Sequence, residues 1–175
     1  MRHRLALAVL LVMALLLLFQ PGRAAGDGSA PPDHGEYPRW QWPVEAPHEV
    51  VEPYRAPAHR YGAGHRGIDL RADVGSEVRA PADGVVAFRG VVVDRPVLTI
   101  EHADQLVSSY EPLTSDLAPG TAVRGGDVIG TVGVGGHAVA GTLHVGVRLR
   151  GEYVNPLLLF GDVARAVLLP CCDDG

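Results

Sequence analysis

The middle of the chain, from residue 50 to residue 160, is a succession of short valine-rich runs separated by Gly, Asp and Pro. Such spacing is typical of many short strands. No stretch here keeps the 3.6-residue apolar period of a helix, and the chain's 22 glycines and 14 prolines would interrupt most helices. Strands are predicted at residues 77–79, 84–93, 97–102, 106–111, 127–132 and 143–149, with a short helix near 156–160. The sequence therefore predicts an all-β domain.

Two segments of this region resemble each other. The run Gly-Ser-Glu-Val-Arg-Ala-Pro-Ala-Asp-Gly-Val-Val at 75–86 is similar to Gly-Thr-Ala-Val-Arg-Gly-Gly-Asp-Val-Ile-Gly at 120–130. The repeat predicts a duplicated strand-turn-strand motif that folds into a compact β-sandwich of short antiparallel strands. Biotinyl and lipoyl carrier domains contain a similar G-x-x-V pattern, but they attach their cofactor to a lysine. This chain has no lysine, so the carrier interpretation is excluded.

The first 25 residues have the composition of a secretory signal peptide. A basic start is followed by an apolar run at residues 5–19 and by a small-residue end, with cleavage predicted after Ala24 or Ala25. The run is shorter than the roughly 20 residues that span a bilayer, so an uncleaved membrane anchor is the less favoured alternative. We therefore expect a secreted or cell-envelope location.

The segments on either side of the domain are expected to be irregular. Residues 26–47 are rich in Pro, Gly and charge, which predicts a flexible lead-in before a domain at 48–161. Its large apolar residues, Trp40 and Trp42, either dock on the domain or stay exposed. A C-terminal tail is predicted at 162–175, and its adjacent cysteines, Cys171 and Cys172, cannot staple the core.

The charge of the chain excludes one class of partner. Removal of the signal peptide takes away three arginines and changes the net charge from −5 to about −8. Nucleic-acid binding depends on clustered cations that neutralise phosphates, and an acidic chain does not favour it. No nucleic-acid partner is therefore expected.

Three residues have the chemistry of a zinc site. His65 and Asp69 lie four residues apart, and His144 lies in a distant apolar segment. Catalytic zinc is commonly held by three nitrogen or oxygen ligands, with a fourth position for water. In an extended chain, residues i and i+4 share a face, so His65 and Asp69 can converge. The alternative is an ordinary surface hydrogen bond between them and a sheet histidine at 144, because His-x-x-x-Asp is a weak pattern.

The order of segments resembles the lysostaphin-like, LytM-type zinc metallopeptidases, which cut peptide cross-links in bacterial cell walls. The resemblance covers residues 65 to 160 and rests on six ordered segments. They are His-Arg-Gly-Ile-Asp-Leu, Val-Arg-Ala-Pro-Ala-Asp-Gly-Val-Val, Ser-Tyr-Glu-Pro-Leu, Val-Arg-Gly-Gly-Asp-Val-Ile-Gly-Thr-Val-Gly, Leu-His-Val-Gly-Val-Arg and Tyr-Val-Asn-Pro-Leu. The resemblance implies a duplicated hybrid motif fold, peptidoglycan as ligand, and Zn²⁺ bound by His65, Asp69 and His144.

The family also carries two histidines near the metal that are not ligands. At the corresponding positions this chain has Thr142, which shares the strand face of His144, and Pro112. Neither can shuttle a proton at neutral pH. Zinc can still lower the pKa of water toward ~7 and polarise a carbonyl. Loss of a positioned acid or base typically costs about 10² to 10⁴ in rate, so a degenerate enzyme is predicted.

Two side chains could replace the missing histidines. Glu111 adjoins Pro112 but is expected on the opposite face of its strand. His137 lies in the glycine-rich loop 133–141 and is the better candidate for a catalytic residue, because a flexible loop over a site can carry catalytic groups. Its alternative is a solvent-exposed loop histidine.

Other side chains are expected to border the site. Tyr110 is expected to face away from Glu111, where it either packs or lines the groove, and it is assigned to the groove together with Arg66. Arg66 and Arg148 either meet substrate carboxylates or form ordinary surface salt bridges. His59 either rims the groove or is an ordinary loop histidine, which is the favoured alternative, and His102 is assigned no chemistry.

These observations predict an exported protein that holds Zn²⁺ and binds peptidoglycan peptides with weak or no hydrolysis. It would act as a wall binder or as a regulator of another cell-wall hydrolase. The first alternative is an active zinc metalloendopeptidase that cleaves peptide cross-links. The second is a domain whose zinc serves folding alone. The sequence favours the binder over the enzyme, because general acid and base groups are hard to replace.

Overall fold

The computed structural model describes residues 37–136 and 139–161. Within them the chain forms strands with one short α-helix and one 3₁₀ turn. In chain order the elements are β1 (Val50–Glu52), β2 (Gly67–Arg71), β3 (Glu77–Arg79), β4 (Gly84–Val92), β5 (Arg95–His102), η1 (Ala103–Gln105), β6 (Leu106–Glu111), β7 (Leu113–Thr114), β8 (Ala122–Val123), β9 (Val128–Val132), β10 (Thr142–Leu149), β11 (Glu152–Val154) and α2 (Leu157–Phe160).

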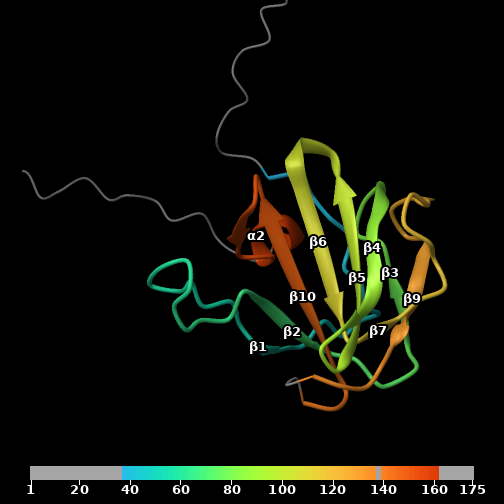
Figure 1. Ribbon diagram of the computed structural model, residues 1–175, viewed down its shortest axis with the longest axis horizontal. Helices are drawn as coiled ribbons and strands as arrows, with labels where there is room; N and C mark the ends of the chain where they lie inside the picture. The colour runs from blue at the N-terminus through green and yellow to red at the C-terminus, as the bar shows by residue number, and fades with distance from the viewer. Residues whose placement is uncertain (1–36, 137–138, 162–175) are drawn as a thin grey trace, which may run out of the picture. The chain divides into compact units, whose positions relative to one another are not determined.

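The strands form two antiparallel sheets (Figure 1). The large sheet has the order β1-β2-β10-β6-β5-β4-β8, with β11 paired to β10, and the small sheet has the order β3-β9-β7. One hydrophobic core joins them, since Val78 and Ile129 of the small sheet belong to the same buried cluster as Leu98 and Ile100 of the large sheet. The prediction of an all-β sandwich of short antiparallel strands is therefore confirmed.

The internal repeat is visible in the backbone hydrogen bonds. The N–H of Gly75 bonds the carbonyl of Val132, and the N–H of Gly120 bonds the carbonyl of Val86, both at 2.8 Å. Both glycines have a positive φ, of 88° and 89°, which a residue without Cβ adopts at no steric cost. Each half of the repeat thus begins with the same turn and pairs with the end of the other half.

The segment before β1 is packed on the domain. Trp40 is buried, and its N–H bonds the carbonyl of Leu159 at 2.9 Å. The ring of Trp42 stacks on Phe160 with a centroid distance of 4.5 Å. Of the two alternatives for the tryptophan pair, docking is the one observed. The flexible segment predicted for 26–47 is therefore ordered in its described part, residues 37–47.

The chain ends lie outside this description. The predicted signal peptide at 1–25, the first part of the lead-in and the tail with both cysteines fall outside the described residues. Among the described residues, no helix has the length and apolar character needed to cross a membrane.

Candidate metal centre

Strand β10 brings the candidate ligands together at the centre of the large sheet. It runs between β2 and β6, and the register pairs His144 with Asp69 on one side and with Glu111 on the other. Directly paired residues of antiparallel strands point to the same side of a sheet. The alternate residues Leu143 and Val145 are fully buried in the core. Three ionisable side chains therefore share the opposite face.

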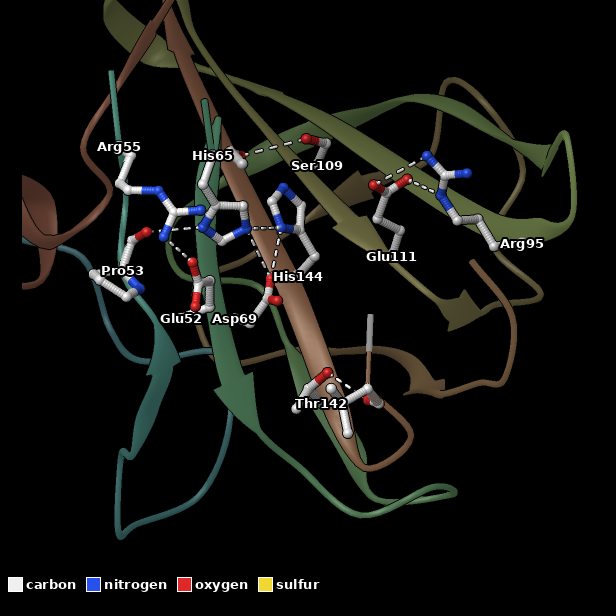
Figure 2. A network of polar contacts seen from close by, with 12 residues as sticks. Glu52, Pro53, Arg55, His65, Asp69, Arg95, Ser109, Glu111, Thr142 and His144 are labelled. Carbon is white, nitrogen blue, oxygen red and sulfur yellow. Dashed lines mark hydrogen bonds and ion pairs between the residues drawn. The ribbon is translucent and has the colours of Figure 1, made fainter. Parts of the chain in front are cut away.

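His65 joins this group from the segment before β2. Its backbone bridges that of Arg55, and its Nδ1 donates a hydrogen bond to the carbonyl of Pro53 at 2.9 Å. Because Nδ1 carries the proton in this bond, the ring lone pair that can bind a metal is on Nε2. Nε2 lies 3.1 Å from Asp69 Oδ1 and 3.1 Å from His144 Nδ1 (Figure 2). The three residues singled out in the sequence thus meet at one point.

The carboxylate of Asp69 is the centre of this cluster. Its Oδ1 lies 2.7 Å from His144 Nδ1, and all three side chains are nearly buried. Burial raises the pKa of Asp69. The hydrogen bonds and charges of His144 and His65 lower it by more than burial raises it, so the pKa lies below its ordinary value. The carboxyl group is therefore ionised at neutral pH. A buried anion between two imidazoles is an environment that attracts a cation.

The donor set fits zinc in chemistry and in size. Two imidazole nitrogens and one carboxylate oxygen are typical ligands of catalytic zinc, at roughly 2.0–2.2 Å. Tetrahedral ligation at that length separates the ligand atoms by about 3.3 Å. The separations of 2.7 to 3.1 Å found here are only slightly shorter. Small shifts of His65, Asp69 and His144 would let these residues hold the ion.

Gly67 makes room for the ring of His144. A Cβ atom at this position would lie 2.7 Å from both Cε1 and Nε2 of His144 and 2.4 Å from the carbonyl oxygen of Val145. Such distances are shorter than any van der Waals contact. The glycine therefore leaves the space that the His144 imidazole occupies, with Nδ1 2.7 Å from Asp69 Oδ1. Sequence reasoning missed this role, although Gly67 stands two residues before the candidate ligand.

The cluster opens onto a cavity of about 440 Å³. Its lining residues are Gly64, His65, Arg66, Val92, Arg95, Val97, Thr99, Ser109, Glu111, His144, Arg148 and Tyr153. The lining residues belong to β4, β5, β6, β10, β11 and the segment before β2, and most of their side chains are polar. The cavity can therefore take a polar ligand whose chain passes the metal cluster.

The structure corrects the orientation predicted for Glu111. This residue lies on the cavity face with His144, where its carboxylate pairs with Arg95 at 2.8 Å and 3.4 Å (Figure 2). The bond to Glu111 raises the pKa of Arg95. The alternation of β6 contained the signal, because buried Leu106 and Tyr110 fix one face as the core face and leave Glu111 on the other.

Tyr110 does not line the groove. It is fully buried and pairs in register with Val145 and Leu98, whose side chains lie in the core. Burial raises the pKa of its phenol well above the ordinary value. The prediction that it borders the groove is therefore wrong, because it was based on the wrong face of β6.

The two positions that carry histidines in the resembling family, Thr142 and Pro112, are not among the residues that line the cavity. The hydroxyl of Thr142 donates a hydrogen bond to the carbonyl of Val139 at 2.6 Å. Pro112 is buried, and its carbonyl accepts a bond from the N–H of Gly133 at 2.9 Å. Both positions are therefore engaged in local structure.

The other three histidines considered in the sequence analysis differ in their surroundings. His59 is exposed and lines a neighbouring cavity. His102 is partly buried and bonds the carbonyl of Asp83 and the hydroxyl of Ser108, both at 2.8 Å. His137, the candidate catalytic residue, lies outside the described residues.

An antiparallel β-sandwich with a His-Asp-His cluster below an open groove defines the class of lysostaphin-like metallopeptidase folds. The profile of Peptidase family M23 matches residues 63–156, which is more than half of the chain. The chain therefore belongs to peptidase family M23, and the resemblance drawn from its motifs is confirmed.

Three relatives illustrate the range of this family. The chain is 34% identical over 134 residues to the uncharacterised protein Rv2891 of Mycobacterium tuberculosis, covering 73% of this chain and 54% of the relative. It is 39% identical over 94 residues to DD-carboxypeptidase/endopeptidase Mpg of Neisseria meningitidis, covering 53% and 22%. It is 31% identical over 121 residues to murein hydrolase activator NlpD of Escherichia coli, covering 67% and 30%. The chain thus spans about half or less of the length of these relatives.

A solved structure supports the same fold. Csd3 of Helicobacter pylori superposes with a TM-score of 0.57 at 28% identity, over 74% of this chain and 36% of that one. This similarity agrees with the fold described above.

Proposed function

We propose that this protein holds Zn²⁺ at His65, Asp69 and His144 and binds peptidoglycan peptides with weak or no hydrolysis. The observation that carries this proposal is the composition of the cavity. Among the described residues that line it, the only histidines are the two candidate ligands His65 and His144, and the only carboxylate is that of Glu111, which is already paired with Arg95. A ligand can therefore bind beside the cluster, but the described lining residues offer no side chain for proton transfer that is not already a candidate ligand or paired.

The residues around the proposed metal would have different roles. Bound zinc would supply Lewis acidity, which polarises a peptide carbonyl. The Pro53 carbonyl fixes the tautomer of His65, and ionised Asp69 neutralises part of the metal charge. The Arg95 guanidinium pairs with the Glu111 carboxylate at 2.8 Å, so this carboxylate already has a partner. These residues bind and orient a peptide better than they cleave it.

The two substituted positions support the same view. A hydroxyl that already donates to a backbone carbonyl, as at Thr142, and a proline ring, as at Pro112, cannot exchange a proton at neutral pH. We propose an exported or cell-envelope location, as the signal-like first 25 residues suggest. The relative named as a murein hydrolase activator makes regulation of another cell-wall hydrolase a reasonable role for such a binder.

The test uses purified peptidoglycan. The zinc-loaded protein is incubated with it, cosedimentation measures binding, and mass spectrometry measures released fragments. We expect binding with at most trace release, and efficient release from a variant with both Thr142→His and Pro112→His. Absence of binding would reject the proposal, and rapid cleavage by the unchanged protein that is lost in Asp69→Ala would replace it with the enzyme.

An active zinc metalloendopeptidase is the second candidate. It is favoured by the position of Glu111, which lies in register with His144 on the cavity face, and by the relative named as a carboxypeptidase and endopeptidase. A carboxylate beside the metal could act as general base if a substrate displaced Arg95. In that case Glu111→Gln would abolish cleavage while leaving zinc affinity unchanged. His137 remains a proposed catalytic residue of this alternative.

A further inference from the structure

Two arginines stand where two cavities meet. The cavity of the metal cluster adjoins a second one of about 400 Å³, and both are lined by Arg66, Arg148 and Tyr153. Arg66 follows the ligand His65 directly in the sequence. The two cavities, together called the depression below, therefore border each other at these side chains.

Neither arginine has an anionic partner among the described residues. Arg66 donates two hydrogen bonds from Nη2, at 2.9 Å and 3.0 Å, to the carbonyls of Arg60 and Gly62. The guanidinium of Arg148 lies over the ring of Tyr153 at 5.9 Å from its centroid. These neutral contacts hold the guanidinium groups in place without compensating their charge.

Some other arginines among the described residues do have anionic partners. Ion pairs with Glu or Asp are formed by Arg55, Arg71, Arg79 and Arg95. The charged side chains that line the two cavities, apart from the metal cluster, are Arg60, Arg66, Arg95 and Arg148 against Glu111 and Glu152. The depression is therefore positive, on a chain whose net charge is −5. Such local excess of cations attracts anionic ligands.

The spacing along β10 relates these charges to the metal cluster. Arg148 follows His144 by four residues on the same face, and Gly146 between them leaves the surface free of a side chain. At about 3.3 Å per residue the two Cα atoms are roughly 13 Å apart. An extended peptide of about four residues can span this distance.

We propose that Arg66 and Arg148 form a carboxylate-binding subsite that anchors an acidic peptide so that its chain extends toward the metal cluster. Guanidinium groups bind carboxylates with strong, charge-assisted hydrogen bonds. The inference rests on the proposed function, because it names the part of a wall peptide that this groove recognises. The carboxylate belongs to the peptide's terminus or to an acidic side chain.

The experiment is a calorimetric titration of the intact protein with a soluble peptidoglycan stem peptide. Three forms of the peptide are compared: one with all carboxylates free, one amidated at its C-terminus and one amidated at its side chains. The variants are Arg66→Gln, Arg148→Gln and both together. Arg124→Gln is the control, because it removes the same charge outside both cavities. Each titration is run with zinc and with a chelator.

We expect the free peptide to bind more tightly than one of the amidated forms, which identifies the recognised carboxylate. Each single variant should weaken binding of the free peptide by about tenfold, as expected for loss of one charge-assisted bond. Arg124→Gln should have no such effect. The preference should persist with the chelator, and the variants should keep the melting temperature of the unchanged protein.

Two results would overturn the subsite and leave the proposed function intact. In the first, all three peptides bind equally well. In the second, the carboxylate preference disappears with the chelator and is insensitive to both arginine variants, which would mean that the carboxylate binds the metal. Failure of every peptide to bind would reject the subsite and the proposed wall-peptide binding together.

Discussion

The domain contains two clusters of polar side chains around histidine that differ in one respect. His102 uses each ring nitrogen once, for the carbonyl of Asp83 and the hydroxyl of Ser108. In the other cluster, His65, Asp69 and His144 direct three ligand atoms at each other within 3.1 Å. In the first cluster each ring nitrogen has one hydrogen-bond partner. In the second cluster three potential metal-ligand atoms lie close to one point.

The difference shows what distinguishes a candidate metal centre from a structural histidine. Burial and hydrogen bonding occur in both, so neither is diagnostic. The ring of His102 also packs on Trp40, with a centroid distance of 4.6 Å, which gives it a role in attaching the N-terminal segment. A surplus of ligand atoms at one point is the feature that indicates a cation.

The largest expected effect separates the two clusters by zinc affinity. Asp69→Ala removes the anionic ligand and should lower zinc affinity by at least about 100-fold, since loss of an outer-shell partner alone costs 10- to 100-fold. His102→Gln should leave zinc affinity unchanged. Competition with a chromophoric chelator measures both. Equal loss in the two variants would show that the clusters do not differ as described.

Zinc should stabilise the fold through the first cluster alone. At a free zinc concentration of 100 times Kd, binding adds about 2.7 kcal/mol to the free energy of unfolding. Chelation should therefore lower the melting temperature of the unchanged protein and of His102→Gln. It should leave that of Asp69→Ala unchanged. Calorimetry of the three proteins tests this, and a chelator effect that persists in Asp69→Ala would place the metal elsewhere.

Gly67→Ala should damage the metal cluster through sterics. The new Cβ would collide with the His144 ring and the Val145 carbonyl, and such overpacking typically costs about 1–3 kcal/mol. We expect lower stability together with lower zinc affinity. Gly125→Ala is the control, because its nearest contact is the backbone of Ala82 at 3.3 Å, away from the cluster. Unchanged zinc affinity in Gly67→Ala would contradict the close packing of the ring.

The smallest effect concerns the pH dependence of His102. Burial lowers the pKa of this imidazole below 6.5, against the opposing effect of its bond to the Asp83 carbonyl. The unfolded chain then binds the proton more readily, so the free energy of unfolding falls as the pH drops below 6.5 toward the folded pKa. Denaturant titrations of the metal-free protein should show a shallower decline in His102→Gln. If the free energy of unfolding fell equally steeply with pH in both proteins, His102 would not contribute to the pH dependence.

Much of the fold could be predicted from short-range patterns. The predicted strands at 77–79 and 106–111 coincide with β3 and β6, and the helix near 156–160 is α2. The strands β1, β2, β7, β8 and β11 were missed. They have two to five residues each, too few to show an apolar alternation, and they exist because neighbouring strands offer them partners.

The candidate site, too, was predictable in part. The chemistry of His65, Asp69 and His144 was readable from residue types and motif order. The face of Glu111 was not inferred correctly, because the prediction was tied to its neighbour Pro112 instead of to buried Leu106 in the same strand. The sequence left open whether Trp40 docks on the domain or stays exposed, since the partners that decide it lie more than 60 residues away.

The sequence by itself determined the β-rich composition, the repeat, the metal-ligand types and the family, because each depends on residue identity and local order. Only the tertiary structure decided which side chains share a face. It set the register of β10 against β2 and β6, which aligns Asp69, His144 and Glu111 across three strands. A shift of one residue would turn every side chain of a strand to the other face. That register depends on contacts between segments far apart in the chain, and these exist only once the sheet has formed.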